Sequence, residues 1–197
     1  TFTGTMSAPN VEEEFSFPNS GLIGAPYSST GTGTIVGDIA AVGSKTYSSL
    51  AEAILDAEEG QPVVVLRNHV DNEVESRITI VKQQTVTIDL NGYVLNVEGF
   101  LNKGTLNIKN GTLVGRTKDY STVESTGTLT LTDVNVTGAR HAVRIEGGTA
   151  IIDGGEYKLS GTSGMTTHAI NVSDSGEVTI KDGIFTGPKG TASDSGA

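Results

Sequence analysis

The most constraining feature of this sequence is a block of strand, polar turn and strand that recurs along much of the chain. Apolar and polar residues alternate within each strand, as in a half-buried β-strand. The first apolar residue of successive blocks advances by 20, 23, 21 and 28 residues, a period typical of solenoid proteins. The blocks are QTVTIDLNGYVLNV (84–97), GTLNIKNGTLVG (104–115), GTLTLTDVNVTG (127–138), GTAIIDGGEYKLSG (148–161) and GEVTIKDGIFTG (176–187).

A second set of short segments interleaves with these blocks, namely HAVRI (141–145), HAINV (168–172) and, one repeat earlier, STVES (121–125). Each repeat therefore supplies about three short strands. A single repeat cannot bury its own apolar side, whereas stacked repeats share one core. We predict an all-β fold, a right-handed parallel β-helix. An antiparallel sandwich is the rival, because Asn-Gly and Asp-Gly also form hairpins, but whole repeats recurring in the same order favour the β-helix.

Stacking the repeats predicts columns of equivalent side chains. The first inward column is Val86, Leu106, Leu129, Ala150 and Val178, and the second is Ile88, Ile108, Leu131, Ile152 and Ile180. The outward column between them is Thr87, Asn107, Thr130, Ile151 and Thr179. The turn dipeptides Asn91-Gly92, Asn110-Gly111, Asp153-Gly154 and Asp182-Gly183 are expected to supply the left-handed backbone that the corners need.

The segment YSSLAEAILDAEEG (47–60) predicts a short N-terminal capping α-helix at about 49–59. Its apolar residues fall on one face, and Ser49 followed by Glu52 forms a capping box. The β-helix domain is expected over 38–187. Residues 1–37 are predicted to be an extended arm rich in Gly, Ser, Thr and Pro, lying against its own domain or a neighbouring subunit, with a flexible stalk as the alternative.

The last residues, 188–197, form a polar tail after the final block. A final turn without a cap would leave strand edges and an apolar cross-section open to association. We expect either a truncated end of a longer solenoid or an end covered by another chain, and hence self-association through the arm and the uncovered C-terminal turn. The chain starts at Thr1 without a signal-like apolar run, which suggests a mature form or an excised fragment.

Charge and composition exclude several classes of partner. The chain has 13 basic and 23 acidic residues and a net charge of −10, which disfavours nucleic-acid binding. Cys is absent, so no disulfide framework or thiolate metal site is expected. No stretch is long and apolar enough to predict a membrane span.

The order YSSLAEAI, a strand, TVTIDLNGYVLNV and GTLNIKNGTL resembles the pectate-lyase-like β-helix modules of large surface proteins of Gram-positive gut bacteria. The same opening is similar to that of many phage tailspike β-helices. The resemblance covers roughly residues 38–187 and rests on the cap, turns and core, so it transfers no catalytic or ligand residue. It implies an extracellular, repetitive and mostly adhesive or structural module. Some relatives are polysaccharide lyases or hydrolases.

No catalytic residue, cofactor or metal site is predicted. Polysaccharide-cleaving β-helices need a carboxylate cluster holding Ca²⁺ or paired carboxylates, whereas Asp133, Asp153 and Asp182 fall at equivalent turn positions after their strands, where a short acid caps the backbone. The densest polar group lies around ARHAVRIEGG, where His141 and His168 open equivalent strands. The candidate ligand-binding residues are Arg140, His141, Arg144 and His168, with the two arginines as carboxylate-recognising groups.

These observations favour a non-enzymatic extracellular structural or adhesive module of a bacterial surface protein or fibre, with glycan as a possible partner. The alternatives are a polysaccharide lyase or hydrolase of pectate-lyase type and a phage tailspike or capsid fibre component. The expected location is extracellular, at a cell surface or on a virion.

Overall fold

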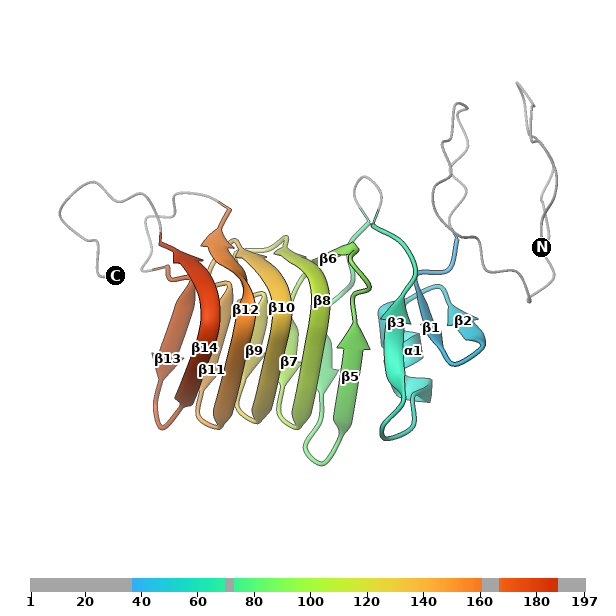
Figure 1. Ribbon diagram of the computed structural model, residues 1–197, viewed down its shortest axis with the longest axis horizontal. Helices are drawn as coiled ribbons and strands as arrows, with labels where there is room; N and C mark the ends of the chain where they lie inside the picture. The colour runs from blue at the N-terminus through green and yellow to red at the C-terminus, as the bar shows by residue number, and fades with distance from the viewer. Residues whose placement is uncertain (1–36, 70–72, 161–166, 188–197) are drawn as a thin grey trace, which may run out of the picture.

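The computed structural model describes residues 37–69, 73–160 and 167–187, and in them the chain winds into a parallel β-solenoid (Figure 1). The predicted tail and all of the predicted arm except Gly37 lie outside the described residues. In chain order the described elements are β1 (Ala40–Val42), β2 (Lys45–Tyr47), α1 (Leu50–Asp56), β3 (Pro62–Val65), β4 (Ile78–Ile80), β5 (Thr85–Asp89), β6 (Val94–Val97), β7 (Phe100–Asn102), β8 (Thr105–Gly115), β9 (Val123–Ser125), β10 (Thr128–Gly138), β11 (Val143–Glu146), β12 (Thr149–Leu159), β13 (Ile170–Ser173) and β14 (Glu177–Thr186).

Within the described residues, the strands form a nine-stranded and a five-stranded sheet. The larger sheet runs β14-β12-β10-β8-β5-β3-β1-β2, with β6 also paired to β8, and the smaller runs β13-β11-β9-β7-β4. Every described pair except β1–β2 and β1–β3 is parallel. This pairing confirms the solenoid and excludes the antiparallel sandwich.

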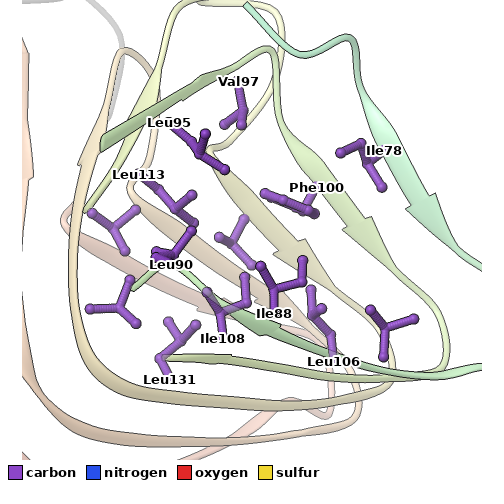
Figure 2. Close-up of a cluster of buried hydrophobic side chains, with 14 of the residues drawn as sticks. Ile78, Ile88, Leu90, Leu95, Val97, Phe100, Leu106, Ile108, Leu113 and Leu131 are labelled. Atoms are coloured by element: carbon purple, nitrogen blue, oxygen red, sulfur yellow. The ribbon is translucent and has the colours of Figure 1, made fainter. Parts of the chain in front are cut away.

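The strand register confirms both predicted inward columns. Val86, Leu106, Leu129, Ala150 and Val178 are paired in succession, as are Ile88, Ile108, Leu131, Ile152 and Ile180. The predicted outward column, from Thr87 to Thr179, is paired in the same way. Figure 2 shows Ile88, Ile108 and Leu131 gathered inside the coil, where each is at most 1% exposed. Alternation along the strand therefore decides which side chains enter the core.

The second strand set also stacks as predicted. Val123 pairs with Val143, which pairs with Ile170, so STVES, HAVRI and HAINV occupy one face of successive turns. Phe100, in β7, pairs with Val123 and extends this column by one turn. The three-residue strand β7 was not predicted, because Phe-Leu-Asn is too short to show a period.

The corner between the two halves of each long strand carries the expected left-handed backbone, but not always at the expected residue. Asn91, Gly92 and Asn110 have φ of 52°, 82° and 60°. In the next two turns the left-handed residues are Asp133 and the pair Gly154 and Gly155, which have φ of 52°, 87° and 90°. Asp133 therefore adopts the conformation that Gly adopts one turn later.

The equivalence of the three turn aspartates was partly wrong. The register pairs Asp153 with Asp182 and with Thr132, which puts Asp133 one position further along, beside Gly154. A Cβ on Gly154 would lie 2.5 Å from Asp133 Oδ1, so the two residues are in close contact. Asp153 directly follows Ile152, the last inward residue of its strand, whereas one residue separates Leu131 from Asp133 and Ile180 from Asp182. Alignment on the apolar residues alone does not show how this difference affects the register.

The capping helix is shorter than predicted, because α1 begins after Ser49 and ends at Asp56. Ser49 Oγ accepts a hydrogen bond from Glu52 N–H at 3.2 Å, which confirms one half of the capping box. The Glu52 carboxylate accepts from Ser48 Oγ at 3.2 Å. Ala57 leaves the helix with ψ of 125°, and the last turn has no basic residue to interact with the helix dipole. Glu58 and Glu59 would add negative charge there, which disfavours further turns.

The two ends of the solenoid differ. At the N-terminal end, β1 and β2 form a hairpin that was not predicted, and β1 pairs with β3. The helix α1 packs against this hairpin and β3 through Leu50, Ala53 and Ile54 (Figure 1). At the C-terminal end, β13 and β14 form the last described turn. There Ile180 is 52% exposed, whereas Ile152, one turn earlier in the same column, is fully buried.

Candidate functional site

The two histidines predicted to share one position do so. The His141 and His168 rings stack with centroids 5.6 Å apart and planes inclined by 15°. The backbone N–H of His168 donates to His141 Nδ1 at 3.1 Å. The parallel pairing of β11 with β13 holds the residues that precede these strands one above the other. The histidine pair thus connects two successive turns of the solenoid and is also a candidate site.

The environment of His141 keeps its ring neutral. The side chain is buried, and the pKa of His141 is lowered to about 4, mainly by this burial and also by the nearby charges of His168, Arg140 and Arg144. Because Nδ1 accepts a backbone hydrogen bond, the ring proton is assigned to Nε2. Nδ1 is therefore engaged by the chain itself. His168 differs, since its Nδ1 is buried without a hydrogen-bond partner.

Both predicted arginines lie close enough to His141 to affect its pKa, and each also contacts its own chain. Arg140 Nη1 donates to the Asp119 carbonyl oxygen at 3.3 Å. Arg144 Nη2 forms an ion pair with Glu146 Oε1 at 2.8 Å, while Arg144 Nε is buried without a partner. The structure thus brings the four candidate residues into one neighbourhood. Their binding of a ligand stays a prediction.

Three residues that the sequence analysis missed, Arg77, Tyr120 and Glu124, extend the polar surface around Arg144. Arg77 lies over the Tyr120 ring, 4.0 Å from its centroid, and its Nη2 lies 3.4 Å from Glu124 Oε2. Glu124 is the register partner of Arg144. We call Arg77, Tyr120, Glu124, Arg144 and Glu146 the arginine face. It combines two guanidinium groups, two carboxylates and one aromatic ring, and a guanidinium group can form two parallel hydrogen bonds with a carboxylate.

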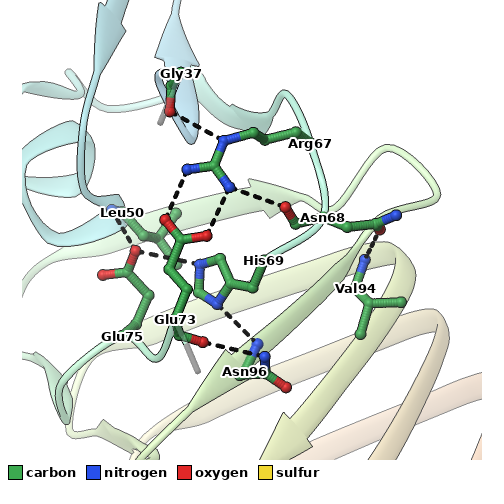
Figure 3. A network of polar contacts seen from close by, with 9 residues as sticks. All are labelled: Gly37, Leu50, Arg67, Asn68, His69, Glu73, Glu75, Val94 and Asn96. Carbon is green, nitrogen blue, oxygen red and sulfur yellow. Dashed lines mark hydrogen bonds and ion pairs between the residues drawn. The ribbon is translucent and has the colours of Figure 1, made fainter. Parts of the chain in front are cut away.

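A second missed feature links the N-terminal cap to the first turn (Figure 3). Arg67, 4% exposed, forms two hydrogen bonds with the Glu73 carboxylate, at 2.6 and 2.7 Å. Its Nε donates to the Gly37 carbonyl oxygen and its Nη1 to that of Asn68, both at 3.0 Å. Such a bidentate pair fixes geometry as well as charge. Arg67 therefore fastens the start of the described chain to the loop after β3.

His69, Glu75 and Asn96 continue this network. His69 Nδ1 accepts from Asn96 N–H at 3.1 Å, and His69 Nε2 lies 3.6 Å from Glu75 Oε1. The same Glu75 oxygen accepts from Leu50 N–H at 3.2 Å, at the first residue of α1. A cleft of about 360 Å³ borders the network, between Ser48 and Ser49 on one side and residues 73–78 on the other. The network joins β6, the helix start and the loop between β3 and β4.

A sequence signal for this network exists, but it is weak. The segment RNHVDNEVESR (67–77) places charged and polar residues between two strand runs. A solvated loop has the same composition, so only the fold shows that Arg67 and His69 point inward.

Within the described ranges, no three His, Asp or Glu side chains gather closely enough to hold a metal ion. The helix found in this part of the chain, α1, is too short to cross a membrane.

The fold and these surfaces define a parallel β-solenoid protein with a capped N-terminal end and a polar face on its smaller sheet. Comparison of the chain with protein-family models, with curated proteins and with solved structures found no match.

Proposed function

We propose that the chain is a non-enzymatic structural or adhesive module of an extracellular bacterial surface protein or fibre. The observation that carries the proposal is a single apolar core that runs without a break from Ile39 to Ala169 through the stacked turns. A rod of parallel turns, in which each turn contacts its neighbours, suits a stiff spacer that holds another part of a protein away from a surface.

The polar groups support a structural rather than a catalytic role. Arg67 and Arg144 pair with Glu73 and Glu146, and His141 is neutral with Nδ1 occupied. A general base needs a free nitrogen or oxygen within reach of a substrate proton. Arg67 and His141 instead connect separate parts of the solenoid, whereas Arg144 and Glu146 pair within β11.

Glycan binding is the adhesive part of the proposal, with the arginine face and the histidine pair as its site. The Tyr120 ring offers an apolar surface, and Arg144 a guanidinium suited to a carboxylate of an acidic sugar. A linear polysaccharide running parallel to the rod axis would cross Leu101, Glu124, Arg144 and Asn171, which the strand register places in successive turns.

Limited proteolysis tests the structural role. A stiff, fully stacked module should yield one resistant fragment that contains residues 73–160, because proteases cleave extended chain that has left its hydrogen-bonded neighbours. A control with Leu131→Lys, which places a charge in the core, should be digested rapidly. Early cleavage of the wild-type chain inside 73–160 would contradict the spacer.

Polysaccharide binding and turnover test the adhesive role against the enzymatic alternative. The wild-type chain is mixed with a uronic-acid polymer, with and without Ca²⁺, and both retention and bond cleavage are measured. We expect binding without cleavage, weakened about tenfold by Arg144→Ala and unchanged by Lys158→Ala on another face. Ca²⁺-dependent cleavage would replace the proposal by the pectate-lyase alternative. A stable trimer in solution would instead favour the tailspike alternative.

A further inference from the structure

The C-terminal end of the solenoid is an apolar surface with an unpaired strand. Within the described residues β14 pairs only with β12, so its other edge carries free backbone donors and acceptors. The large apolar side chains at this end are substantially exposed, namely Val172 at 47%, Ile180 at 52%, Ile184 at 66% and Phe185 at 38%. An edge and an apolar patch together mark a surface for association with another β-strand.

The opposite end cannot serve as the complement of this surface. There β1 and β2 form an antiparallel hairpin, and β2 has only three residues. Asp56 of α1 holds β2 through an ion pair with Lys45 Nζ at 3.0 Å and a hydrogen bond from the Tyr47 hydroxyl group. A short edge strand that is held by such side-chain contacts is a poor partner for another strand. Head-to-tail stacking of identical copies therefore lacks a matching open turn.

Among the described surfaces, the C-terminal end combines an open edge strand with exposed apolar side chains. The surface that matches it is therefore the same end of a second copy.

We propose that two copies associate through their C-terminal turns, with β14 antiparallel to β14 of the second copy about a two-fold axis. The axis passes between Lys181 and Asp182, so that each Lys181 lies opposite Asp182 of the second copy. This arrangement is isologous and closes after two subunits. Lys181 Nζ lies 3.2 Å from Asp153 Oδ2 of its own copy, so in the dimer each Lys181 lies between that carboxylate and Asp182 of the second copy. These two equivalent contacts and a continuous β-ladder then connect the solenoids end to end.

The same register places inward side chains opposite inward ones and outward side chains opposite outward ones. Val178 and Phe185 pair with the inward Ala150 and Tyr157 of the preceding turn, so both point toward the core, and the proposed pairing places them opposite each other. Thr179 and Ile184 pair with the outward Ile151 and Glu156 of the preceding turn. Both therefore point away from the core, and the proposed pairing places them opposite each other as well.

Side-chain size fits as well, since the exposed Ile180 lies opposite Gly183 of the second copy. A shift of one residue would set inward side chains against outward ones. The register with Lys181 opposite Asp182 thus satisfies charge, direction and size together.

Light scattering and sedimentation of the full chain test the proposal. We expect a concentration-dependent dimer, with twice the 20.3 kDa mass of the chain. Lys181→Glu should weaken the dimer about tenfold, because both symmetric pairs become repulsive. Adding Asp182→Lys should restore it to within about threefold, since the charges are then exchanged. The control Lys109→Glu makes the same charge change in β8, which β10 and β12 separate from β14, and also removes an intrachain ion pair, with Asp89, so it should have no effect on the dimer.

A second variant pair tests the register directly in this cysteine-free chain. Under oxidation, Thr179→Cys with Ile184→Cys should form an intermolecular disulfide, because these residues face each other across the axis. Glu177→Cys with Ile184→Cys, offset by two residues, should not. Equal cross-linking of both pairs, or of neither, would overturn the register.

A monomer at all concentrations, a growing polymer, or a dimer that Lys181→Glu leaves unchanged would overturn the proposal. So would a full-length monomer that dimerises once residues 1–36 are deleted, since the arm would then cover the end within one copy. These outcomes are separate from the proposed function, because a protease-resistant monomer would remain a structural module.

Discussion

One corner of the solenoid places residues with left-handed backbone directly above one another. Asn110, Asp133 and Gly154 have φ of 60°, 52° and 87°, and the strand register places them in successive turns. Asn and Asp tolerate this conformation better than other side chains do. Gly155, next to Gly154, has φ of 90°, and a Cβ there would lie 2.0 Å from the Val134 carbonyl oxygen. This corner therefore requires Gly for two independent reasons.

Gly155→Ala and Gly92→Ala separate these two reasons. Both positions have positive φ, but a Cβ on Gly92 would meet nothing within 4 Å. We expect Gly92→Ala to lower the free energy of unfolding by about 1 kcal/mol, from backbone strain alone. Gly155→Ala should cost about 3 kcal/mol or more, because the backbone of β10 must also move. Equal costs in urea-denaturation curves would contradict the close approach.

The buried His141 predicts a specific pH dependence. Its pKa is about 4 in the folded protein against 6.5 without the fold. Between these values the unfolded chain binds the proton and the folded chain does not, so stability falls as the pH is lowered from 6.5 to about 4. The loss is on the order of 2 to 3 kcal/mol, since each pH unit in this window is worth about 1.4 kcal/mol.

His141→Asn tests this origin, because Asn Oδ1 can still accept the His168 N–H bond but does not titrate. The free energy of unfolding of the variant should vary less with pH in this window. Parallel curves for the variant and the wild type, obtained by denaturation at each pH, would show that the loss comes from other groups.

At the scale of elements, the N-terminal cap depends on polar contacts as much as on apolar packing. Leu50, Ala53 and Ile54 give α1 its buried side. Arg67 then connects Gly37 and Asn68 to Glu73, and Glu75 accepts from the first N–H of the helix. A seven-residue helix has little intrinsic stability, so these contacts decide whether the cap stays docked.

The Arg67–Glu73 pair should show a favourable coupling energy, because removing either partner leaves the other in a partly buried place without their shared ion pair. Arg67→Met leaves the Glu73 carboxylate without this partner in a partly buried place, and we expect a cost on the order of 3 kcal/mol. Arg67→Met with Glu73→Leu should cost less than the sum of the two single changes. The exposed Lys158–Glu156 pair is the control, and Glu156→Gln should cost at most about 1 kcal/mol. Thermal denaturation of the wild type and these four variants measures the coupling, and strict additivity would contradict it.

What the sequence predicted well are the elements with a repeated pattern. The inward columns through Leu106 and Ile108 follow from strict alternation, and the histidine pair follows from two copies of His-Ala at equivalent places. Elements that occur once were predicted only where they have a pattern of their own, as α1 does in its apolar face and its Ser49 cap. The hairpin β1–β2 has three-residue strands, and its position depends on antiparallel pairing with β3 at long range.

The polar contacts were the least predictable part. Asn102 lies in an otherwise mostly apolar inward position, fully buried, where its Nδ2 donates to Ser125 Oγ at 2.9 Å and to the Thr128 carbonyl oxygen at 2.8 Å. Likewise, Arg77 meets Glu124 across 47 residues of sequence. Such pairs depend on which side chains the turns bring together, and strand periodicity does not encode this. Strand periodicity also does not encode ligand binding, so this role stays a prediction for Arg140, His141, Arg144 and His168.

At the scale of the whole molecule, the solenoid behaves as a row of turns that stabilise their neighbours. An interior turn has a neighbour on both sides, whereas the last described turn has one. In such a quasi-one-dimensional structure, stability is close to a sum of turn and interface contributions. Local opening should therefore begin at β13 and β14, which makes that end the most responsive to association.

Leu131→Ala and Ile180→Ala test this gradient within one column of the core. Leu131 is fully buried between two turns, and we expect its truncation to cost about 3 kcal/mol, from lost burial and the cavity left behind. Ile180 is 52% exposed in the monomer, so its truncation should cost less than about 1 kcal/mol in dilute solution. If two copies join through β14, Ile180 becomes covered, and its truncation should cost more as the protein concentration rises, while the cost at Leu131 stays constant. Chemical denaturation at low and high protein concentration measures both quantities. An equal cost at the two positions in dilute solution would mean that the last turn is already covered by another part of the same chain.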